Sequence, residues 1–372
     1  MNLLGLRLIA NIMNWTDDGV ATSEYNWLQL AASAKYDGYS DFRAGSRFIE
    51  SLATWLKQFD SDDRQTAYDF VKHRLVYISN AEMYRVIDAF LPETVTPLFR
   101  RLATEQIGIR PHEVWGNSEA VAAFDQILRR SLIVGMSDGS RIDVLRRANS
   151  GRISQEQVVP MMNIGIEKWR DLGSKLQERG DGDRHFEHVF LIDDFTASGT
   201  TFIRNNGDGW KGKLRKFNDM VAAARSELGD AFPIAEGYAL HIHHYVSTSQ
   251  AREALIERVD QASHDWHERS YGSIAITEGM LLPPSLPLQS PLDDAVIALC
   301  EKYYDHWLFL RLEEHAGEAG QTDFKMGYAD CALPLVLEHN TPNNSIPLLW
   351  AETPGEHGHK MQPLFRRRDR HG

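Results

Sequence analysis

The residues best suited to chemistry lie between positions 188 and 202, in the stretch HVFLIDDFTASGTTF. Four apolar residues predict a buried strand, and two adjacent carboxylates, Asp193 and Asp194, follow at its carboxyl end. A turn of small residues then leads toward a predicted helix; its members are Ala197, Ser198, Gly199, Thr200 and Thr201. Backbone N–H groups in such a turn can converge on an anion at the positive end of the following helix.

The acid pair and the turn suit two different parts of one ligand. Carboxylates repel a phosphate, but they accept hydrogen bonds from the vicinal hydroxyls of a ribose. Ligands of parallel α/β sheets bind beyond the carboxyl ends of the strands. We therefore predict a site for a ribose 5-phosphate moiety, with the hydroxyls on Asp193 and Asp194 and the phosphate on residues 198–201. The alternative is a strand end with two solvated carboxylates and a cap-like turn.

The elements that position these residues follow from the apolar spacing. From residue 22 to about 110 the spacing is helical, with breaks at turn residues. After Trp115 strands alternate with helices, and we predict strands at 132–136, 189–192, 234–246 and 273–277. This alternation indicates an α/β fold with a mostly parallel sheet and helices on both faces. We expect a helical N-terminal domain (1–115), an α/β core (116–285), and a C-terminal helix and hood with a basic tail (286–372).

The stretch 188–202 resembles the phosphoribosyl-diphosphate (PRPP) signature of the type I phosphoribosyltransferases. The likeness is specific over about thirteen residues, and a looser likeness covers roughly residues 118–277. The resemblance implies that Asp193 and Asp194 hold the ribose hydroxyls, take part in catalysis and contact Mg²⁺ indirectly. It implies that residues 197–201 hold the 5-phosphate, with PRPP as substrate or ligand and Mg²⁺ as cofactor.

The resemblance also assigns a diphosphate-binding loop and a mobile loop. The diphosphate loop follows the strand at 132–136 and comprises Ser137, Asp138, Gly139, Ser140 and Arg141. The mobile loop corresponds to residues 165–188, where Lys175 is the expected catalytic cation. Its cations could close over a leaving diphosphate. A solvated charged loop is the alternative interpretation.

The acceptor side of the site is less defined. Relatives that act on 6-oxopurines carry an acid where this chain has Ala197, so the resemblance disfavours hypoxanthine and guanine. His244 and Tyr245 end a predicted strand and are candidates for contacting a base. The Asn-rich stretch 333–350 supplies His339, Asn340 and Asn343 as candidates in a base-reading hood, or else forms a polar turn.

Two other motifs resemble ligand sites, but each lacks a residue that the site would require. The stretch GDGWKGK at 207–213 has the glycine and lysine spacing of a phosphate-binding P-loop, but Leu214 stands where Ser or Thr must bind Mg²⁺. His241, His243 and His244 resemble zinc ligands, but no Cys, Asp or Glu lies near enough in sequence to complete a tetrahedral set. We expect this histidine strand to pack against a helix.

Composition limits the class of protein. The 372 residues carry a net charge of −12, which argues against coating nucleic acid or an anionic membrane by bulk charge. Two cysteines, Cys300 and Cys331, are too few for a disulfide framework. No apolar run approaches the ~18 residues of a membrane span. We therefore expect a cytoplasmic protein without a secretory leader.

The whole chain has a second, looser resemblance to phosphoribosyltransferase-like proteins of bacterial anti-phage conflict operons, including retron-type systems. That resemblance implies a winged-helix or reverse transcriptase–DNA partner, and a homo-oligomer or complex subunit. Two functions stay open at this point. The first is a transferase that forms or cleaves an N-glycosidic bond, and the second is a non-catalytic nucleotide-sensing subunit that uses the same pocket.

Overall fold

The computed structural model describes residues 3–40, 42, 47–179, 185–205, 207, 209–317 and 320–367. The chain divides into two units: Met1–Glu82 with Pro284–Gly372, the terminal unit, and Met83–Pro283, the α/β unit. This division differs from the boundary expected at residue 115, because the helices between residues 83 and 129 belong to the α/β unit. The two ends of the chain, expected as separate domains, fold together.

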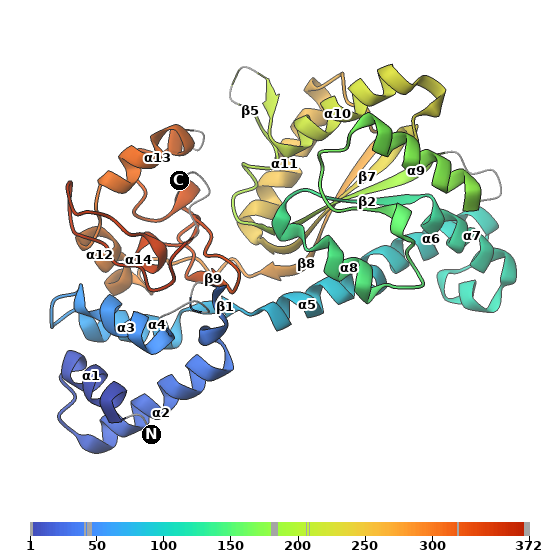
Figure 1. Cartoon of the computed structure of the whole chain (residues 1–372). Helices are drawn as coiled ribbons and strands as arrows, with labels where there is room; N and C mark the ends of the chain where they lie inside the picture. The colour runs from blue at the N-terminus through green and yellow to red at the C-terminus, as the bar shows by residue number, and fades with distance from the viewer. Residues whose placement is uncertain are drawn as a thin grey trace. The chain divides into compact units, whose positions relative to one another are not determined.

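The terminal unit combines helices from both ends of the chain (Figure 1). Its elements are α1 (Leu3–Met13), α2 (Asp18–Ala34), α3 (Phe48–Lys57), α4 (Arg64–His73), β1 (Val76–Ile78), α12 (Asp294–Lys302), α13 (Trp307–Gly317), β9 (Leu335–Leu337) and α14 (Pro347–Trp350). The short strands β1 and β9 pair in parallel. Phe365 packs against the rings of Tyr36, Phe48 and Tyr77, so the C-terminal segment completes the core begun by the N-terminal helices.

The α/β unit is built on a five-stranded sheet with the order β3-β2-β4-β7-β8. Every neighbouring pair in this sheet is parallel. The strands are β2 (Ser131–Gly135), β3 (Val158–Val159), β4 (Phe186–Thr196), β7 (Ile234–Thr248) and β8 (Ser273–Leu282). This architecture confirms the predicted fold class. Strand β3 was not predicted, because two residues are too short to show a period.

One face of the sheet is covered by the helices that connect its strands. These are α9 (Ile166–Arg179), α10 (Lys213–Leu228) and α11 (Ser249–Asp265). Their apolar side chains, such as Trp169, Phe217 and Leu255, share a core with Leu191 of β4 and Ile242 of β7. Because side chains alternate along a strand, the residues between them must face the other way.

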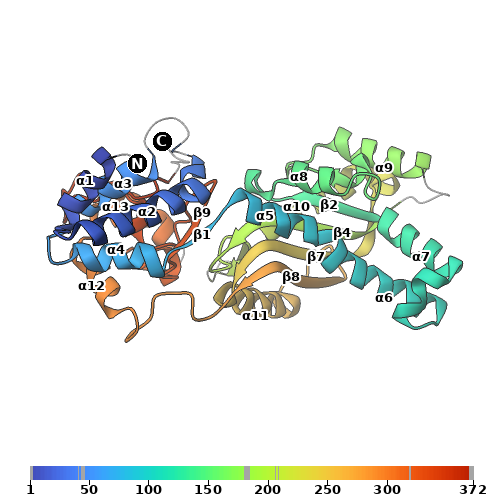
Figure 2. The same cartoon turned by 90° about the horizontal axis from the view of Figure 1, so that it is seen from below.

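The other face meets the helices that precede the sheet in the chain. Helix α5 (Asn80–Ala89), the π-helical segment η3 (Phe90–Val95) and α6 (Thr96–Ile107) run along it (Figure 2). Phe90 contacts the rings of Phe190 and His243, and Phe99 contacts His188. The histidine strand thus packs against helical residues, as expected. Helix α7 (Ser118–Arg129) leads from this layer into β2, and α8 (Ile142–Ala148) follows it.

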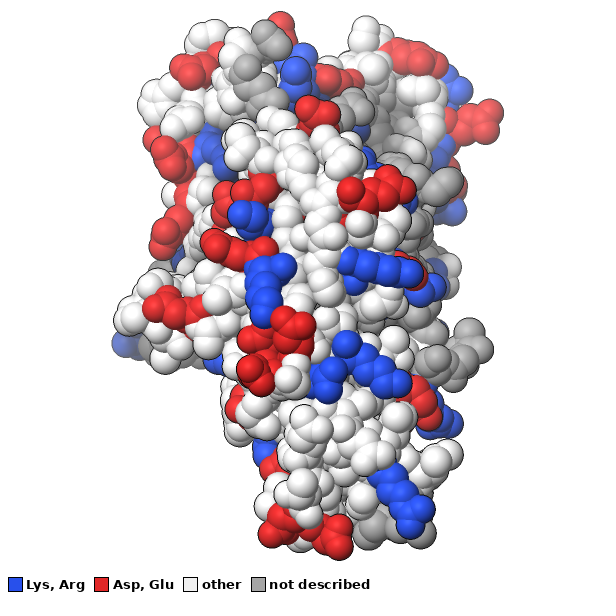
Figure 3. Space-filling model, turned by 90° about the vertical axis from the view of Figure 1, so that its left-hand side faces the viewer, with Lys and Arg blue, Asp and Glu red and all other residues white. Residues whose placement is uncertain are grey.

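The distribution of surface charge and the lengths of the helices match two expectations from the composition, namely no coating of nucleic acid by bulk charge and no apolar run of membrane-spanning length. Acidic and basic side chains are interspersed on the face drawn in Figure 3, where the described residues form no broad basic patch. Within the described ranges, no helix is both long enough and apolar enough to cross a membrane.

Candidate functional site

The predicted acids lie at the point where the strand order of the sheet reverses. After β2 the chain passes to β3 on one side, whereas β4, β7 and β8 continue on the other. Loops that leave β2 and β4 therefore diverge and open a crevice beyond the carboxyl ends of these strands. Gly135, the last residue of β2, pairs with Ile192 of β4, so Asp193 and Asp194 come just beyond the end of β2.

Strand β4 is longer than predicted, and this separates the two acids. The ladder between β4 and β7 continues past the acids to the pair Thr196↔Ser247. Asp193 and Asp194 are consecutive residues within this strand, so their side chains project from opposite faces of the sheet. The two carboxylates therefore leave β4 in different directions, but both reach the loop 137–141: Asp193 contacts Ser137, and Asp194 lies against Gly139.

Asp193 is buried and held by two side chains from different loops. Ser137 donates its hydroxyl to Asp193 Oδ1 at 2.6 Å, and Lys213 Nζ forms an ion pair with Oδ2. Only 5% of Asp193 is exposed to solvent. A carboxylate at this depth requires such compensation, since burying an unpaired charge is costly.

Asp194 lies against the loop that follows β2. A β-carbon built on Gly139 would come within 2.2 Å of Asp194 Oδ2, so a larger residue here would have to displace the carboxylate or the loop. The side chain of Asp194 is half-buried. The loop predicted to hold a diphosphate is thus brought directly onto the second acid.

That loop is fixed to the sheet by Ser140. The Ser140 hydroxyl donates to the carbonyl of Ile192 at 2.8 Å and accepts from the backbone N–H groups of Met136 and Ser137. Asp138 is exposed, whereas the guanidinium of Arg141 lies 5.5 Å from the ring centroid of Tyr84. Residues 137–141 therefore form a rigid turn between β2 and α8, as the predicted strand–turn–helix pattern requires.

The turn at residues 197–201 keeps backbone donors available. The N–H groups of Ser198, Gly199 and Thr201 have no hydrogen-bond partner among the described residues. The turn is held through its carbonyls instead: Thr248 donates to Ala197 O at 2.7 Å, and Arg258 donates to Ser198 O at 3.1 Å. Free N–H groups in a fixed turn are the donors that an anion site needs.

The helix expected directly after this turn begins later. A hairpin of β5 (Arg204–Asn205) and β6 (Trp210–Lys211) intervenes, and α10 starts at Lys213. The N–H groups of Lys213 and Leu214 donate to the carbonyls of Thr201 and Phe202 at 3.1 and 3.0 Å. The hairpin thus returns the chain to the turn, and the helix begins beside it.

Lys213 is a site residue that the sequence interpretation missed. In the motif GDGWKGK, Lys213 corresponds to the lysine of a P-loop, and since the P-loop is disfavoured the sequence assigns this lysine no other role. A glycine–lysine pair shortly after a phosphate-type turn was the available signal. Its position next to Asp193 depends on the hairpin, whose folded path no local pattern predicts.

His244 and Tyr245 both lie next to the acids, on opposite faces of β7. His244 pairs with Asp193 in the strand register, and its burial lowers its pKa to about 4 against the opposing effect of Asp193. Tyr245 is fully buried, and burial together with Asp194 raises its pKa. The Tyr245 hydroxyl has no hydrogen-bond partner within the described structure. Both residues therefore lie beside the two acids, and their contact with a base stays a prediction.

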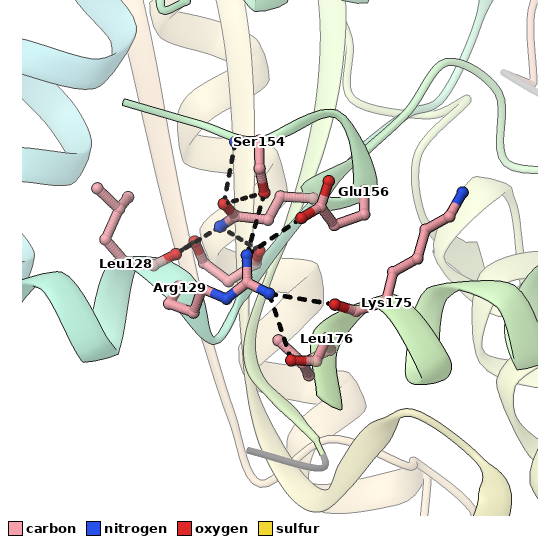
Figure 4. Close-up of polar contacts among 8 residues, drawn as sticks. Leu128, Arg129, Ser154, Glu156, Lys175 and Leu176 are labelled. Atoms are coloured by element: carbon pink, nitrogen blue, oxygen red, sulfur yellow. Dashed lines mark hydrogen bonds and ion pairs between the residues drawn. The ribbon is translucent and has the colours of Figure 1, made fainter. Parts of the chain in front are cut away.

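The expected mobile loop and its cation lie elsewhere. Residues 166–179 form helix α9, and residues 180–184, the remaining tip of the expected loop, lie outside the described residues. Arg129, just before β2, donates to the carbonyls of Lys175 and Leu176 at 3.2 and 3.3 Å (Figure 4). Lys175 therefore lies at the amino edge of the sheet, opposite the acids. The prediction placed it at the wrong edge because amphipathic spacing was not recognised in a charge-rich segment.

The histidines of β7 show no metal-ligand set. His241 Nε2 lies 3.1 Å from His188 Nδ1, and His243 Nδ1 lies 3.0 Å from the Thr277 hydroxyl. No group of three or more His, Cys, Asp or Glu side chains suited to a metal ion occurs in the described ranges.

The candidate hood residues belong to the terminal unit. Asn340 donates its N–H to Leu337 O at 2.9 Å, and Asn343 accepts from the N–H of Tyr328 at 2.7 Å. His339 lies in the same turn after β9. Thus His339, Asn340 and Asn343 are in a different unit from Asp193 and Asp194.

Comparisons with known proteins indicate the family to which this chain belongs. No curated protein and no solved structure matches the chain. A family model named PRTase-CE matches residues 52–367, which is most of the chain and includes the whole α/β unit. A phosphoribosyltransferase-type family name agrees with a sheet that carries two acids and an anion-type turn at its switch point. This chain therefore belongs to the PRTase-CE family.

Proposed function

We propose that the α/β unit binds PRPP or a related nucleotide and forms or cleaves an N-glycosidic bond at its ribose. The observation that carries this proposal is the juxtaposition of Asp193, Asp194 and the turn 197–201 at the switch point of the sheet. The acids accept hydrogen bonds from the ribose hydroxyls, and the unpartnered N–H groups of the turn receive the 5-phosphate.

The proposed chemistry is substitution at C1 of the ribose. In the transferase direction the bond from C1 to diphosphate breaks, diphosphate keeps the electron pair, and a ring nitrogen bonds to C1 and loses its proton. Asp193 and Asp194 orient the ribose and stabilise the positive charge that develops on it. The loop 137–141 supplies backbone N–H donors to the diphosphate, because the hydroxyls of Ser137 and Ser140 already donate to Asp193 and to the carbonyl of Ile192.

Mg²⁺ fits this site as an ion bound mainly through the ligand. Carboxylates and phosphates are its preferred partners, but both oxygens of Asp193 already have partners in Ser137 and Lys213. When bound, Mg²⁺ would neutralise the diphosphate leaving group. The two acids would then hold the ribose hydroxyls and contact the ion indirectly.

A second candidate function is nucleotide sensing without turnover. It is favoured by the helical structure of residues 166–179, which puts Lys175 at the edge of the sheet opposite the acids. Such a protein would use ligand binding to bias a partner interaction. The resemblance to anti-phage proteins extends both candidates to a defence role with a nucleic-acid-associated partner.

The test is calorimetric titration with PRPP and Mg²⁺, with inorganic triphosphate, which carries phosphates but no ribose, as the comparison ligand. Binding of PRPP by the wild type and a weakened, still measurable affinity in Asp193→Asn and Asp194→Asn are expected. Asp125→Asn on the exposed face of α7 is the matched control. Unchanged affinity in both site variants would refute the assignment. Incubation with PRPP and a panel of free bases then separates the candidates, since diphosphate release supports a transferase and binding without release supports a sensor.

A further inference from the structure

Lys213 physically connects the two halves of the candidate site. Its backbone N–H donates to Thr201 O at 3.1 Å, at the end of the phosphate turn. Its side chain extends to Asp193, where Nζ forms an ion pair with Oδ2. The lysine therefore reaches from the proposed phosphate position to the proposed ribose position.

The backbone conformation of Gly212 fixes the position of Lys213. Gly212 has φ of +111°, and a β-carbon there would come within 2.4 Å of Phe202 O. A glycine at this point lets the chain return from the β5–β6 hairpin and start α10 against the turn. Without that close approach, the first residue of α10 could not span the two halves.

The ion pair with Asp193 has a clear role in the ligand-free protein. The carboxylate of Asp193 is 7% exposed and the Lys213 side chain 23%, so the lysine compensates a nearly buried charge while keeping access to solvent. A ribose hydroxyl can replace Nζ as a donor to Asp193. A phosphate carries ~1.5–2 negative charges and can receive the displaced ammonium. Lysine suits such an exchange because its ammonium is a compact charge on a flexible stem.

We propose that Lys213 is the positioning residue by which this site recognises the phosphate of its ligand. On binding, Nζ leaves Asp193 for the phosphate oxygens at the turn, and a ribose hydroxyl takes its place on Asp193. The proposal rests on the proposed function and specifies its ligand class. The ligand must carry both a phosphate and vicinal hydroxyls, because a riboside without phosphate would break the ion pair and leave the ammonium without an anion.

The experiment compares ribose 5-phosphate with ribose by calorimetric titration. Lys213→Met is expected to weaken ribose 5-phosphate binding by about 10- to 100-fold, the value of one charge-assisted hydrogen bond. It is expected to leave ribose binding unchanged or stronger, since Asp193 no longer has a competing partner. Lys213→Arg should retain part of the phosphate preference. Lys216→Met, an exposed lysine one turn along α10, is the matched control and should behave as the wild type.

The possible results separate failure of the inference about Lys213 from failure of the proposed function. If Lys213→Met binds ribose 5-phosphate as the wild type does, the phosphate role of Lys213 is wrong and the proposed function stands. If the affinities for ribose and ribose 5-phosphate fall equally, Lys213 is structural only, which also overturns the inference. If the wild type binds neither PRPP nor ribose 5-phosphate, both the proposed function and the inference about Lys213 are wrong.

A double variant keeps the inference testable if Lys213→Met does not fold. The double variant Asp193→Asn/Lys213→Met removes both charges and leaves no buried ion unpaired. It should fold and show no preference for ribose 5-phosphate over ribose, whereas Asp193→Asn alone should keep a preference. A double variant that still prefers the phosphate would overturn the inference.

Discussion

The backbone of Gly139 lies directly against the carboxylate of Asp194. A β-carbon on Gly139 would come within 2.2 Å of Oδ2 and 2.6 Å of Cγ. Gly139 is in the loop after β2, and Asp194 is in the neighbouring strand β4. The contact therefore sets the distance between the proposed diphosphate loop and the second acid.

Gly139→Ala should damage ligand binding more than folding. The added methyl group must displace either the loop or the Asp194 carboxylate, at a cost of about 1–3 kcal/mol. We expect PRPP affinity to fall by about tenfold or more, as measured by calorimetry. Gly165→Ala, where a β-carbon meets nothing within 4 Å, is the control. Equal affinities in the two variants would contradict the proposed role of the loop.

The ion pair between Lys213 and Asp193 should appear in a double-mutant cycle of stability. Lys213→Met leaves the buried Asp193 carboxylate without its cation and should lower the free energy of unfolding by about 1–3 kcal/mol. Adding Asp193→Asn should restore part of that loss, because the residual charge is removed. Urea titration of the four proteins measures the coupling. Additive effects would show that the two groups do not interact in solution.

Gly212→Ala should impair both the start of α10 and the placement of Lys213. Gly209 has a similar positive φ of +104°, but a β-carbon there meets nothing within 4 Å, whereas one at Gly212 meets Phe202 O. Gly209→Ala therefore reports backbone strain alone, about 1–2 kcal/mol. Gly212→Ala should lose more stability and more PRPP affinity than Gly209→Ala. Equal losses would show that the close approach at Gly212 is unimportant.

The half-buried His188 and the buried His241 should make the protein sensitive to mild acid. Burial lowers the pKa of each imidazole to about 4, below the ordinary value of 6.5. Above about pH 6.5 both residues are neutral in the folded and the unfolded chain, so they do not make stability depend on pH. Between about pH 6.5 and 4 the unfolded chain binds protons that the folded chain does not, so stability falls as the pH falls.

The pH effect can be measured by urea titration at several pH values. Each such histidine should contribute on the order of 1 kcal/mol per pH unit to the loss. His188→Phe removes one titrating group beside the ring of Phe99 and should reduce the slope. His112→Gln, at an exposed position, should leave the slope unchanged. A slope unaffected by His188→Phe would show that His188 binds protons equally in the folded and the unfolded chain, which would contradict the lowered pKa.

Lys175→Ala should leave the candidate site intact. Lys175 makes an exposed ion pair with Asp171 on the same helix, and removing it should cost less than about 0.5 kcal/mol. Its backbone contacts Arg129 at the amino edge of the sheet, so PRPP affinity should stay within about twofold. Calorimetry with PRPP tests this directly. A tenfold loss would restore Lys175 as a cation of the site.

The local order of the site residues could be read from the sequence. Apolar residues before Asp193 predict a buried strand, and the small residues 197–201 predict the turn that follows. The same reasoning found the strand before loop 137–141. These features depend on neighbouring residues in the chain, so a single sequence contains the information for them.

The faces of the two acids could also have been predicted, but the length of β4 was missed. Acidic residues normally end a buried strand, so the prediction stopped the strand before Asp193. In the structure β4 continues because β7 pairs with it as far as Thr196. A partner strand satisfies the backbone beyond the acids, and a local pattern does not contain that partner.

The sequence by itself determined the alternation of strands and helices, the acids and the turn. Only the tertiary structure decided that Lys213 meets Asp193, that the helices of residues 83–129 belong with the sheet, and that Lys175 lies at the opposite edge. Apolar periodicity tells which face of an element is buried, but not which other element covers it. Those pairings depend on strand order and chain reversal between distant segments, which are settled only when the whole core packs.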